Sequence, residues 1–189
     1  MGNVEVVEYR SLWRVRFAEL RDAYAAALEA SGVVVRGIEH VGSTAVPGLA
    51  AKPMIDVDVV VAAADVAAAV RALASIGFRV SAGGDVPGRV AFVTPERFRP
   101  SNTYVVVAGS LALRNHLAVR DNLRADDALR DEYAEIKRDA AARASDLDDY
   151  RAMKDAVLGR ILRRAGLSAE DLAGITAANR AIADRGALG

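Results

Sequence analysis

Asp56 and Asp58 stand two residues apart in the apolar run 54–61, a spacing that suits phosphate chemistry. Residues two apart in a β-strand point to the same face, so the two carboxylates would lie together. Carboxylates of this kind hold Mg²⁺ against substrate phosphates. A buried strand does not keep two carboxylates together without a counter-ion. We therefore predict that Asp56 and Asp58 are a catalytic, metal-binding pair, and the alternative is a solvated strand face.

A turn-rich loop over residues 40–48 precedes this strand, and Gly42 and Ser43 open it directly after an expected strand. Small residues let backbone N–H groups approach a phosphate, and the Ser43 hydroxyl adds a further donor. Gly42 and Ser43 are therefore predicted to bind nucleotide phosphates, with an ordinary turn as the alternative. Lys52, between the loop and the aspartates, is expected either to contact a phosphate or to neutralise the aspartates.

Two tyrosine–lysine pairs have helical spacing, Tyr133 with Lys137 and Tyr150 with Lys154. Four residues apart on a helix, the phenol and the ammonium share one face. Lys154 is predicted to bind a triphosphate, with a lysine lying along a tyrosine at the rim of the core as the alternative. Lys137 is expected to have the structural role.

Arg120 and Arg124 are predicted to add cations to the same triphosphate. Their alternative is an internal ion pair with Asp121. His40 precedes the Gly-Ser turn and is expected mainly to tie the loop to the backbone, and His116 is expected to be structural.

Composition excludes several classes of protein. The 189 residues carry 25 basic and 25 acidic side chains, no cysteine and two histidines. A formal charge of zero gives no field for polyanions, and the lack of cysteine excludes disulfides, thiol nucleophiles and thiolate metal sites. The first residues lack a basic and apolar leader. We expect a cytoplasmic protein without nucleic-acid or membrane partners.

Hydrophobic periodicity predicts an α/β fold. The pattern predicts, in chain order, helix 9–30, one short strand or two over 33–41 broken by Gly37, strand 54–61, helix 65–73, strands 89–94 and 103–107, and helices 111–124, 127–144, 146–165 and 169–185. This order predicts a mixed sheet of about four or five strands flanked by helices, with a helical C-terminal half. Residues 1–166 are expected to form one domain, and 167–189 a helical or partly disordered tail.

The stretch HVGSTAVPGLAAKPMIDVD, residues 40–58, resembles the signature of the GrpB family. Residues 116–124, 133–137 and 150–154 resemble the same family, and the similarity extends from about residue 6 to 165. The resemblance implies the fold of the polymerase-beta-like nucleotidyltransferases. It also implies that Gly42 and Ser43 belong to a phosphate-binding turn and that Asp56 and Asp58 bind metal.

Two departures from the family pattern concern the strand 103–107. Nucleotidyltransferases of this fold usually take a third carboxylate from this neighbouring strand, which has none here, and Glu96 and Asp85 lie in expected turns. GrpB proteins commonly carry His-x-His where this chain has Asn102 and Tyr104. An amide and a phenol form hydrogen bonds but do not shuttle protons near neutral pH. Asn102 and Tyr104 are therefore predicted to contact the acceptor substrate.

Taken together, the residues predict an enzyme that binds ATP or another nucleoside triphosphate with Mg²⁺. It would transfer a nucleotidyl group to a small-molecule acceptor, or activate that acceptor. One alternative is a catalytically impaired nucleotide-binding or protein-partner module. Another is an ATP-dependent ligase of a specialised biosynthetic pathway.

Overall fold

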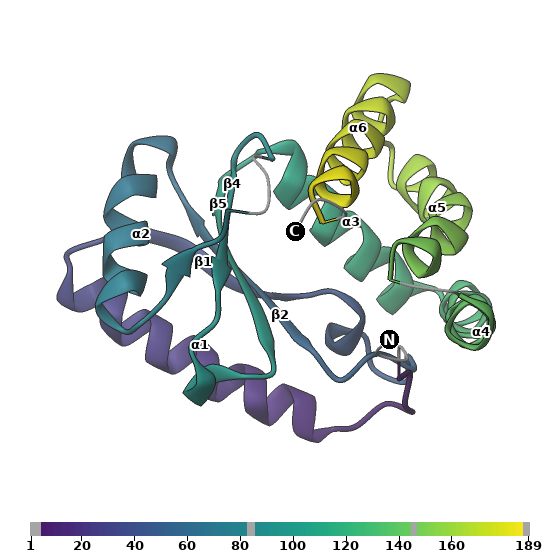
Figure 1. Cartoon of the computed structure of the whole chain (residues 1–189), viewed down its shortest axis with the longest axis horizontal. Coiled ribbons are helices and arrows are strands. Elements are labelled where there is room, and N and C mark those ends of the chain that lie inside the picture. Colours follow the sequence, from purple (N-terminus) through teal and green to yellow (C-terminus); the bar gives the residue numbers. More distant parts are fainter. Residues whose placement is uncertain (1–4, 83–85, 145–146, 187–189) are drawn as a thin grey trace.

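A five-stranded mixed sheet forms the centre of the molecule (Figure 1). The computed structural model describes residues 5–82, 86–144 and 147–186. The strands are β1 (Val35–Val41), β2 (Ile55–Val61), β3 (Arg79–Val80), β4 (Arg89–Val93) and β5 (Ser101–Val107), and their order is β1-β2-β5-β4-β3. β2 and β5 are parallel, whereas the other neighbouring pairs are antiparallel. The strand with the two aspartates thus lies inside the sheet.

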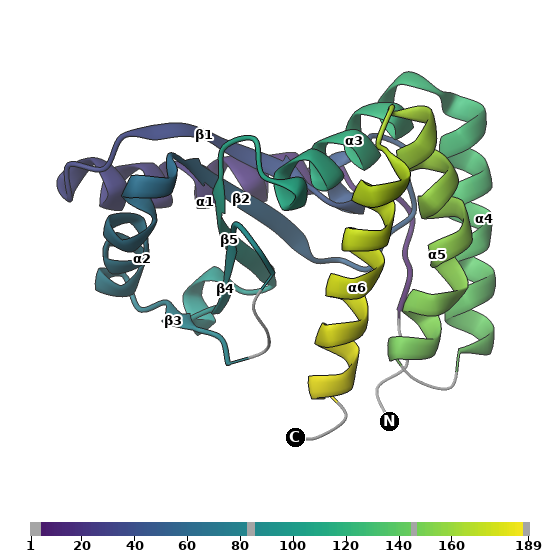
Figure 2. The same ribbon diagram turned by 90° about the horizontal axis from the view of Figure 1, so that it is seen from above.

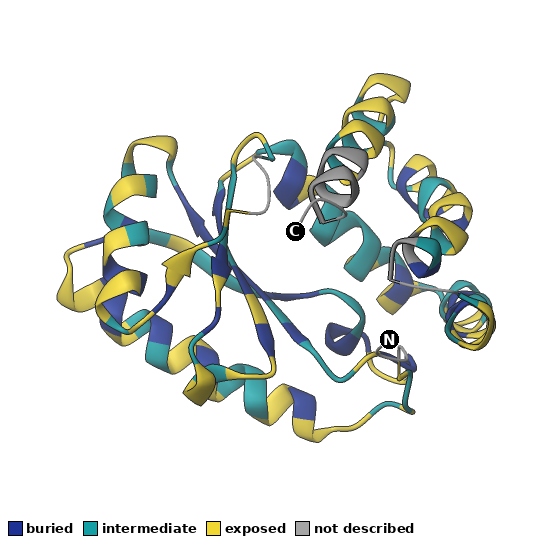
Figure 3. Cartoon of the chain, in the orientation of Figure 1, coloured by how far each residue is buried: buried dark blue, intermediate teal, exposed yellow. Residues whose placement is uncertain are grey.

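Helices α1 (Leu12–Ala30) and α2 (Val66–Ser75) cover one face of the sheet (Figure 1). Val57, Val59 and Val61 of β2 and Val105 of β5 point to this face and pack in one buried cluster with side chains of α1 and α2. Figure 3 colours most of β2 and parts of α1 and α2 as buried. Because these strand residues alternate, the aspartates between them must point to the opposite face.

Helix α3 (Leu111–Ala125) crosses that opposite face. Val60 of β2 and Val106 of β5 pack there against Ala112 and Leu113 of the helix. Ser110 begins α3 as an N-cap, since its side chain accepts a hydrogen bond from the Leu113 amide. This face of the sheet therefore has two parts. It carries the aspartates towards the start of β2, and towards the end of the strand it has the apolar surface against which α3 packs.

Helices α4 (Asp127–Arg143), α5 (Leu147–Arg164) and α6 (Ala169–Gly186) lie side by side next to the sheet (Figure 2). A second buried cluster joins the loop after β1 to these helices through Val46, Leu49 and Ala50 of the loop, Leu123 of α3, Tyr133 of α4 and Ile161 of α5. The helical half is thereby packed against the Gly-Ser turn.

Helix α6 is attached to α3 by an ion pair between Arg114 and Asp171, with nitrogen–oxygen distances of 2.7 and 3.1 Å. At its start, Ser168 and Asp171 exchange hydrogen bonds between side chain and backbone, which resembles a capping box. The predicted domain boundary at residue 166 stays a prediction.

The expected fold class is confirmed: an α/β mixed sheet flanked by helices, with a helical C-terminal half. Several boundaries differ. Where one strand or two broken by Gly37 were expected, the structure has one strand, Val35–Val41, because an irregularity in register between Val35 and Gly37 absorbs the glycine without breaking the ladder. The last strand begins at Ser101 and not at Thr103, so it includes Asn102. The first helix begins at Leu12, not at Tyr9, whose ring packs edge-on against Trp13 from outside the helix. Among the described helices, none is both long and apolar enough to cross a membrane.

Candidate functional site

A pocket of about 390 Å³ lies beside the start of β2, on the face that carries the aspartates. Its lining residues are Ser43, Thr44, Lys52, Met54, Asp56, Asn102, Lys137, Tyr150 and Lys154. Five of the predicted site residues, Ser43, Lys52, Asp56, Asn102 and Lys154, thus meet in one pocket. They come from the loop after β1, from β2, from β5 and from α5, so the pocket joins the sheet to the helical half.

Asp56 is the carboxylate in this pocket. It lies opposite Asn102 in the parallel β2–β5 ladder, and the Asn102 amide donates a 2.8 Å hydrogen bond to Asp56 Oδ1. Burial raises the pKa of Asp56, although the hydrogen bond from Asn102 acts in the opposite direction. Asn102 therefore orients the carboxylate, whether or not it also contacts an acceptor.

Gly42 lies directly against Asp56. A Cβ atom on Gly42 would lie 2.2 Å from Asp56 Oδ2, and the φ of Gly42 is +69°, a conformation that favours glycine. The structure therefore explains why residue 42 is a glycine without a phosphate: any side chain would prevent the turn from passing this close to the carboxylate. Its predicted contact with phosphate stays a prediction.

Asp58 shares the face of Asp56 but has different surroundings. It is fully buried, and its Oδ2 lies 2.7 Å from His116 Nδ1 of α3. Its Oδ1 is buried and has no hydrogen-bond partner among the described residues. The ring of Tyr104, opposite Asp58 in the ladder, lies 5.9 Å from the His116 ring between centroids.

His116 is a site residue that the sequence analysis did not identify. Leu113 and Leu117 are its neighbours on the expected helix, which favoured a structural role. A signal was nevertheless present, because the helix that contains His116 directly follows the strand that contains Tyr104. Such a helix packs back onto the sheet beside that strand, and here it covers Asp58.

The two carboxylates fit a Mg²⁺ site in which water and phosphate oxygens would supply the remaining ligands. The unpaired Asp58 Oδ1 is a buried oxygen in need of a partner, and Asp56 follows it along the same face. In the part of the chain that the structure describes, no group of three or more His, Asp or Glu side chains gathers as a metal site. Mg²⁺ commonly keeps several waters and takes one or two protein carboxylates plus phosphate oxygens.

No third carboxylate joins this pair within the described residues. Glu96 belongs to the short helix Glu96–Phe98 and forms an exposed ion pair with Arg99 at 3.0 Å. Asp85 lies outside the described residues.

Lys137 lines the pocket although a structural role was expected for it. It is 2% exposed, its Nζ donates a 2.7 Å hydrogen bond to the Ala50 carbonyl, and it lies 5.4 Å from the Tyr133 ring centroid. Burial, and then the charge of Lys154, lower the pKa of Lys137 to about 7. The ammonium of Lys154 lies 4.1 Å from the ring centroid of Tyr150. The predicted pairings along both helices therefore form, and both lysines face the pocket.

Arg120 and Arg124 are not among the residues that line the pocket. They hold β1 and the loop that follows it through the contacts below. Arg120 donates to Glu39 at 2.6 Å and to Asp121 at 2.7 Å, so the predicted internal ion pair is present. Both Nε and a terminal nitrogen of Arg124 donate to the Ala45 carbonyl, at 3.0 and 2.8 Å. Their predicted contact with a triphosphate stays a prediction.

His40 ties the loop together, as expected. Its Nε2 lies 3.0 Å from Thr44 Oγ1, which in turn donates to the Met54 carbonyl. The ring stacks on Phe17 with centroids 4.6 Å apart. Burial, and then the charges of Arg124 and Arg120, lower the pKa of His40 to about 4, so the imidazole is neutral at pH 7.

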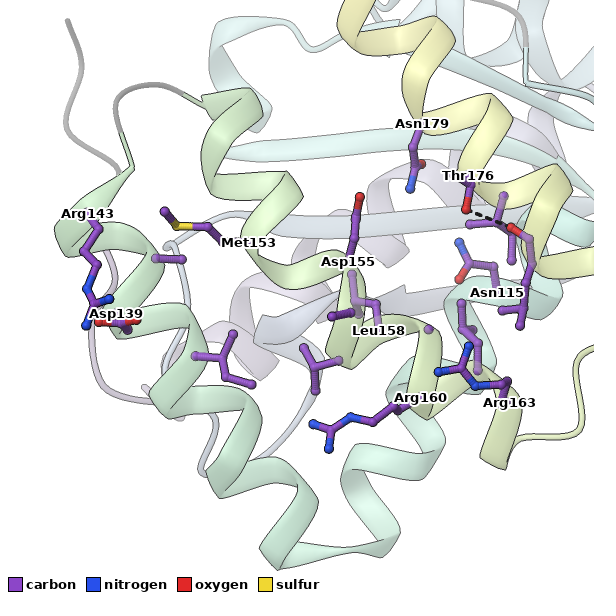
Figure 4. Close-up of a pocket in the computed structure, with 18 residues that line it drawn as sticks. Asn115, Asp139, Arg143, Met153, Asp155, Leu158, Arg160, Arg163, Thr176 and Asn179 are labelled. Carbon is purple, nitrogen blue, oxygen red and sulfur yellow. Dashed lines mark hydrogen bonds and ion pairs between the residues drawn. The ribbon is translucent and has the colours of Figure 1, made fainter. Parts of the chain in front are cut away.

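A larger cavity of about 790 Å³ lies among the helices of the C-terminal half (Figure 4). Its described lining residues include neither aspartate of β2 and none of the lysines, and its Asp139 and Arg143 neutralise each other at 2.7 Å. Size alone does not make it the functional site, because its described lining does not bring an acidic residue of β2 together with lysines.

Comparison with known proteins assigns the chain to a family. The family model described as GrpB protein matches residues 3–164. UPF0157 protein SCO7215 of Streptomyces coelicolor is 38% identical over 143 residues, which cover 74% of this chain and 73% of that protein. A UPF0157 protein of Deinococcus radiodurans is 35% identical over 131 residues, which cover 69% and 68%.

Solved structures agree with this assignment. The crystal structure of conserved protein GrpB from Enterococcus faecalis superposes with a TM-score of 0.72 at 30% identity, over 85% of this chain and 96% of that chain. Cid1 poly(U) polymerase bound to MgATP matches with a TM-score of only 0.46 at 12% identity, over 70% of this chain and 45% of that chain. The first match and the family model confirm the resemblance to the GrpB family. The second carries no functional argument.

Proposed function

We propose that this chain, which belongs to the GrpB family, binds a nucleoside triphosphate with Mg²⁺ in the Asp56 pocket. It then transfers the nucleotidyl group to a small-molecule acceptor, or uses the nucleotide to activate that acceptor. We expect ATP to be a substrate. A cytoplasmic location and the absence of nucleic-acid and membrane partners belong to the same proposal.

The observation that carries this proposal is the distribution of lysine. Only three of the 25 basic residues are lysines, Lys52, Lys137 and Lys154, and all three line the Asp56 pocket. Lysine is a compact charge with three rotatable donors, which suits a flexible polyphosphate, whereas the planar arginine fork suits fixed bidentate contacts. A pocket that collects every lysine of an arginine-rich chain is suited to an anion with several phosphates.

The carboxylate side of the pocket complements this cationic side. Asp56, held by Asn102, and Asp58, with its unpaired oxygen, are the residues that would hold Mg²⁺. When bound, Mg²⁺ would stabilise the negative charge that develops on the phosphoryl group under attack. The lysines would orient the terminal phosphates, and Ser43 of the turn lines the same pocket. At about 390 Å³ the pocket falls within the usual range of small-ligand sites.

A second candidate function is nucleotide binding without turnover. The observation that favours it is the absence of a third carboxylate beside Asp56 and Asp58 within the described residues. Binding and turnover must therefore be measured separately.

Titration calorimetry with MgATP tests the proposal. We expect saturable binding by the full chain, a loss of affinity of at least tenfold in Lys154→Met, and unchanged affinity in the control Arg21→Gln, which alters an exposed ion pair of α1. Failure to bind MgATP, or equal affinity in Lys154→Met, would refute the assignment of the pocket. Release of pyrophosphate or ADP with a panel of acids and amines then separates an enzyme from a binding module.

A further inference from the structure

A second, smaller cavity of about 130 Å³ lies between the start of β4, α3 and α6. Its lining residues are Val86, Pro87, Arg89, Leu111, Ala112, Asn115, His116, Gly174, Ile175, Ala178 and Asn179. His116 belongs to this lining and also contacts Asp58. The two cavities therefore lie on the same face of the sheet, and the Asp58–His116 pair stands between them.

Arg89 is the cation of this cavity, and part of its hydrogen-bonding capacity is unused. Its guanidinium lies 4.7 Å from the centroid of the Tyr104 ring. Its Nε is buried and has no hydrogen-bond partner in the part of the chain that the structure describes. No described carboxylate forms an ion pair with Arg89, and none lines the cavity. A buried N–H without a partner is costly, so a ligand oxygen at this place would be stabilising.

The other lining residues define the shape of that ligand. Asn115 of α3 and Asn179 of α6 add amide groups, and both also line the larger cavity of Figure 4. The remaining wall is aliphatic, formed chiefly by Leu111, Ile175 and Ala178. A cavity of roughly 150 Å³ accommodates benzene, so about 130 Å³ suits a ligand of about six non-hydrogen atoms.

Helix α6 closes the cavity and lies outside the residues that the family model matches, which end at residue 164. Its close packing on α3 depends on Gly174, where a Cβ atom would lie 3.1 Å from Leu111 Cδ2. The Arg114–Asp171 ion pair fixes the same contact. The element that completes the cavity thus lies outside the residues that the family model matches.

We propose that this cavity binds a small aliphatic carboxylic acid, with its carboxylate on Arg89 and its chain against the aliphatic wall. A planar carboxylate matches the guanidinium fork, and the net positive lining excludes a cationic ligand. If the Asp56 pocket holds the nucleotide, the acid is the acceptor, and α6 determines which acid is accepted. That second step rests on the proposed function, whereas binding of the acid does not.

The test is calorimetric titration of the full chain with propanoate, butanoate and pentanoate, and with pentanamide as an uncharged match of pentanoate. We expect at least one carboxylate to bind, and pentanamide to bind at least tenfold more weakly than pentanoate. Arg89→Gln should weaken carboxylate binding at least tenfold. The control Arg79→Gln, on the exposed strand β3, should not change it.

Ala178→Leu gives an independent test, because it fills the cavity without altering a charge. It should abolish binding of the acids and leave the affinity for MgATP unchanged, so it decides the question if Arg89→Gln does not fold.

The inference is overturned if no acid binds, if pentanamide binds as well as pentanoate, or if Ala178→Leu binds acids like the unaltered chain. Acid binding without MgATP binding would refute the proposed function alone, and MgATP binding without acid binding would refute this inference alone.

Discussion

His116 Nδ1 lies 2.7 Å from Asp58 Oδ2, and this contact places a helical imidazole over a fully buried carboxylate of the central sheet. Asp56, two residues before Asp58, instead opens into the pocket that contains the three lysines. The two aspartates lie on the same face of β2, but their surroundings differ. Asp56 lines the proposed nucleotide pocket, whereas Asp58 contacts His116, which lines the second cavity.

Asp56→Asn should abolish Mg²⁺-dependent binding of ATP, because one metal ligand and half of the local negative charge are lost. The variant should be at least as stable as the unaltered chain at pH 7. Burial raises the pKa of Asp56, so its contribution to stability is present below the pKa of the unfolded carboxyl, near 3.8, and is lost as pH rises through the raised pKa. Calorimetry and thermal unfolding measure the two effects. Unchanged MgATP affinity would contradict the assignment, and Asp22→Asn on the exposed side of α1 is the matched control.

Gly42→Ala should lower both the stability and the affinity for MgATP. The substitution places a Cβ atom 2.2 Å from Asp56 Oδ2 and also enforces a strained positive φ, which by itself costs about 1–2 kcal/mol. Gly32→Ala is the control, since Gly32 has a φ of +66° and nothing within 4 Å of the added Cβ. We expect a clearly larger fall in melting temperature for Gly42→Ala than for Gly32→Ala, and loss of affinity only in the former. Equal behaviour of the two variants would show that the contact with Asp56 is unimportant.

Binding of a triphosphate should take up a proton at pH 8 through Lys137. In the free protein the pKa of Lys137 is lowered to about 7, so at pH 8 its ammonium is mostly deprotonated, and the phosphates favour the charged form. The charged groups around it are Lys154, Asp56 and Arg138. Calorimetry in buffers of different ionisation enthalpy measures the uptake, which Lys137→Met should remove. A proton uptake that persists in Lys137→Met belongs to another group and would contradict this assignment.

The same lowered pKa predicts a pH-dependent stability. A depressed pKa means that the contribution of Lys137 is present above the pKa of an unfolded lysine, near 10.5, and is lost as pH falls through about 7. The difference in unfolding free energy between the chain and Lys137→Met should therefore rise in favour of lysine from pH 7 towards pH 10. A difference that does not change over this interval would show that Lys137 keeps an ordinary pKa.

Tyr104→Phe should weaken binding of the acid without changing the affinity for MgATP. The Phe ring keeps the contact with the Arg89 guanidinium and with His116, so only the hydroxyl is removed. Tyr104 is not among the described lining residues of the cavity, so this variant tests the contact with an acceptor that the sequence predicts: if the hydroxyl bonds the acid, its loss costs about 0.5–1.5 kcal/mol in acid binding, the value of one hydrogen bond. If the melting temperature falls while both affinities stay unchanged, Tyr104 has a purely structural role in the core.

The sequence by itself determined the features that depend on near neighbours. Alternation along residues 55–61 predicts that Asp56 and Asp58 share one face of a strand, because side chains of a strand alternate whatever packs on them. The turn at Gly42 and Ser43, the tyrosine–lysine pairs of the two helices and the α/β class follow from similarly local patterns. The long motif over residues 40–58 further identified the family.

Tertiary structure alone decided which side chains meet across the chain. Lys52, Lys137 and Lys154 gather in one pocket because α4 and α5 pack on the apolar loop 46–50, from which their contacting residues lie about 85 to 115 positions away in the sequence. His116 reaches Asp58, and Arg120 turns towards Glu39 instead of the pocket, because α3 lies across β2 at one particular position. Periodicity tells which face of a helix is buried, but not the point on the sheet against which it packs. That point is set by the fit of long-range apolar contacts, which no local pattern records.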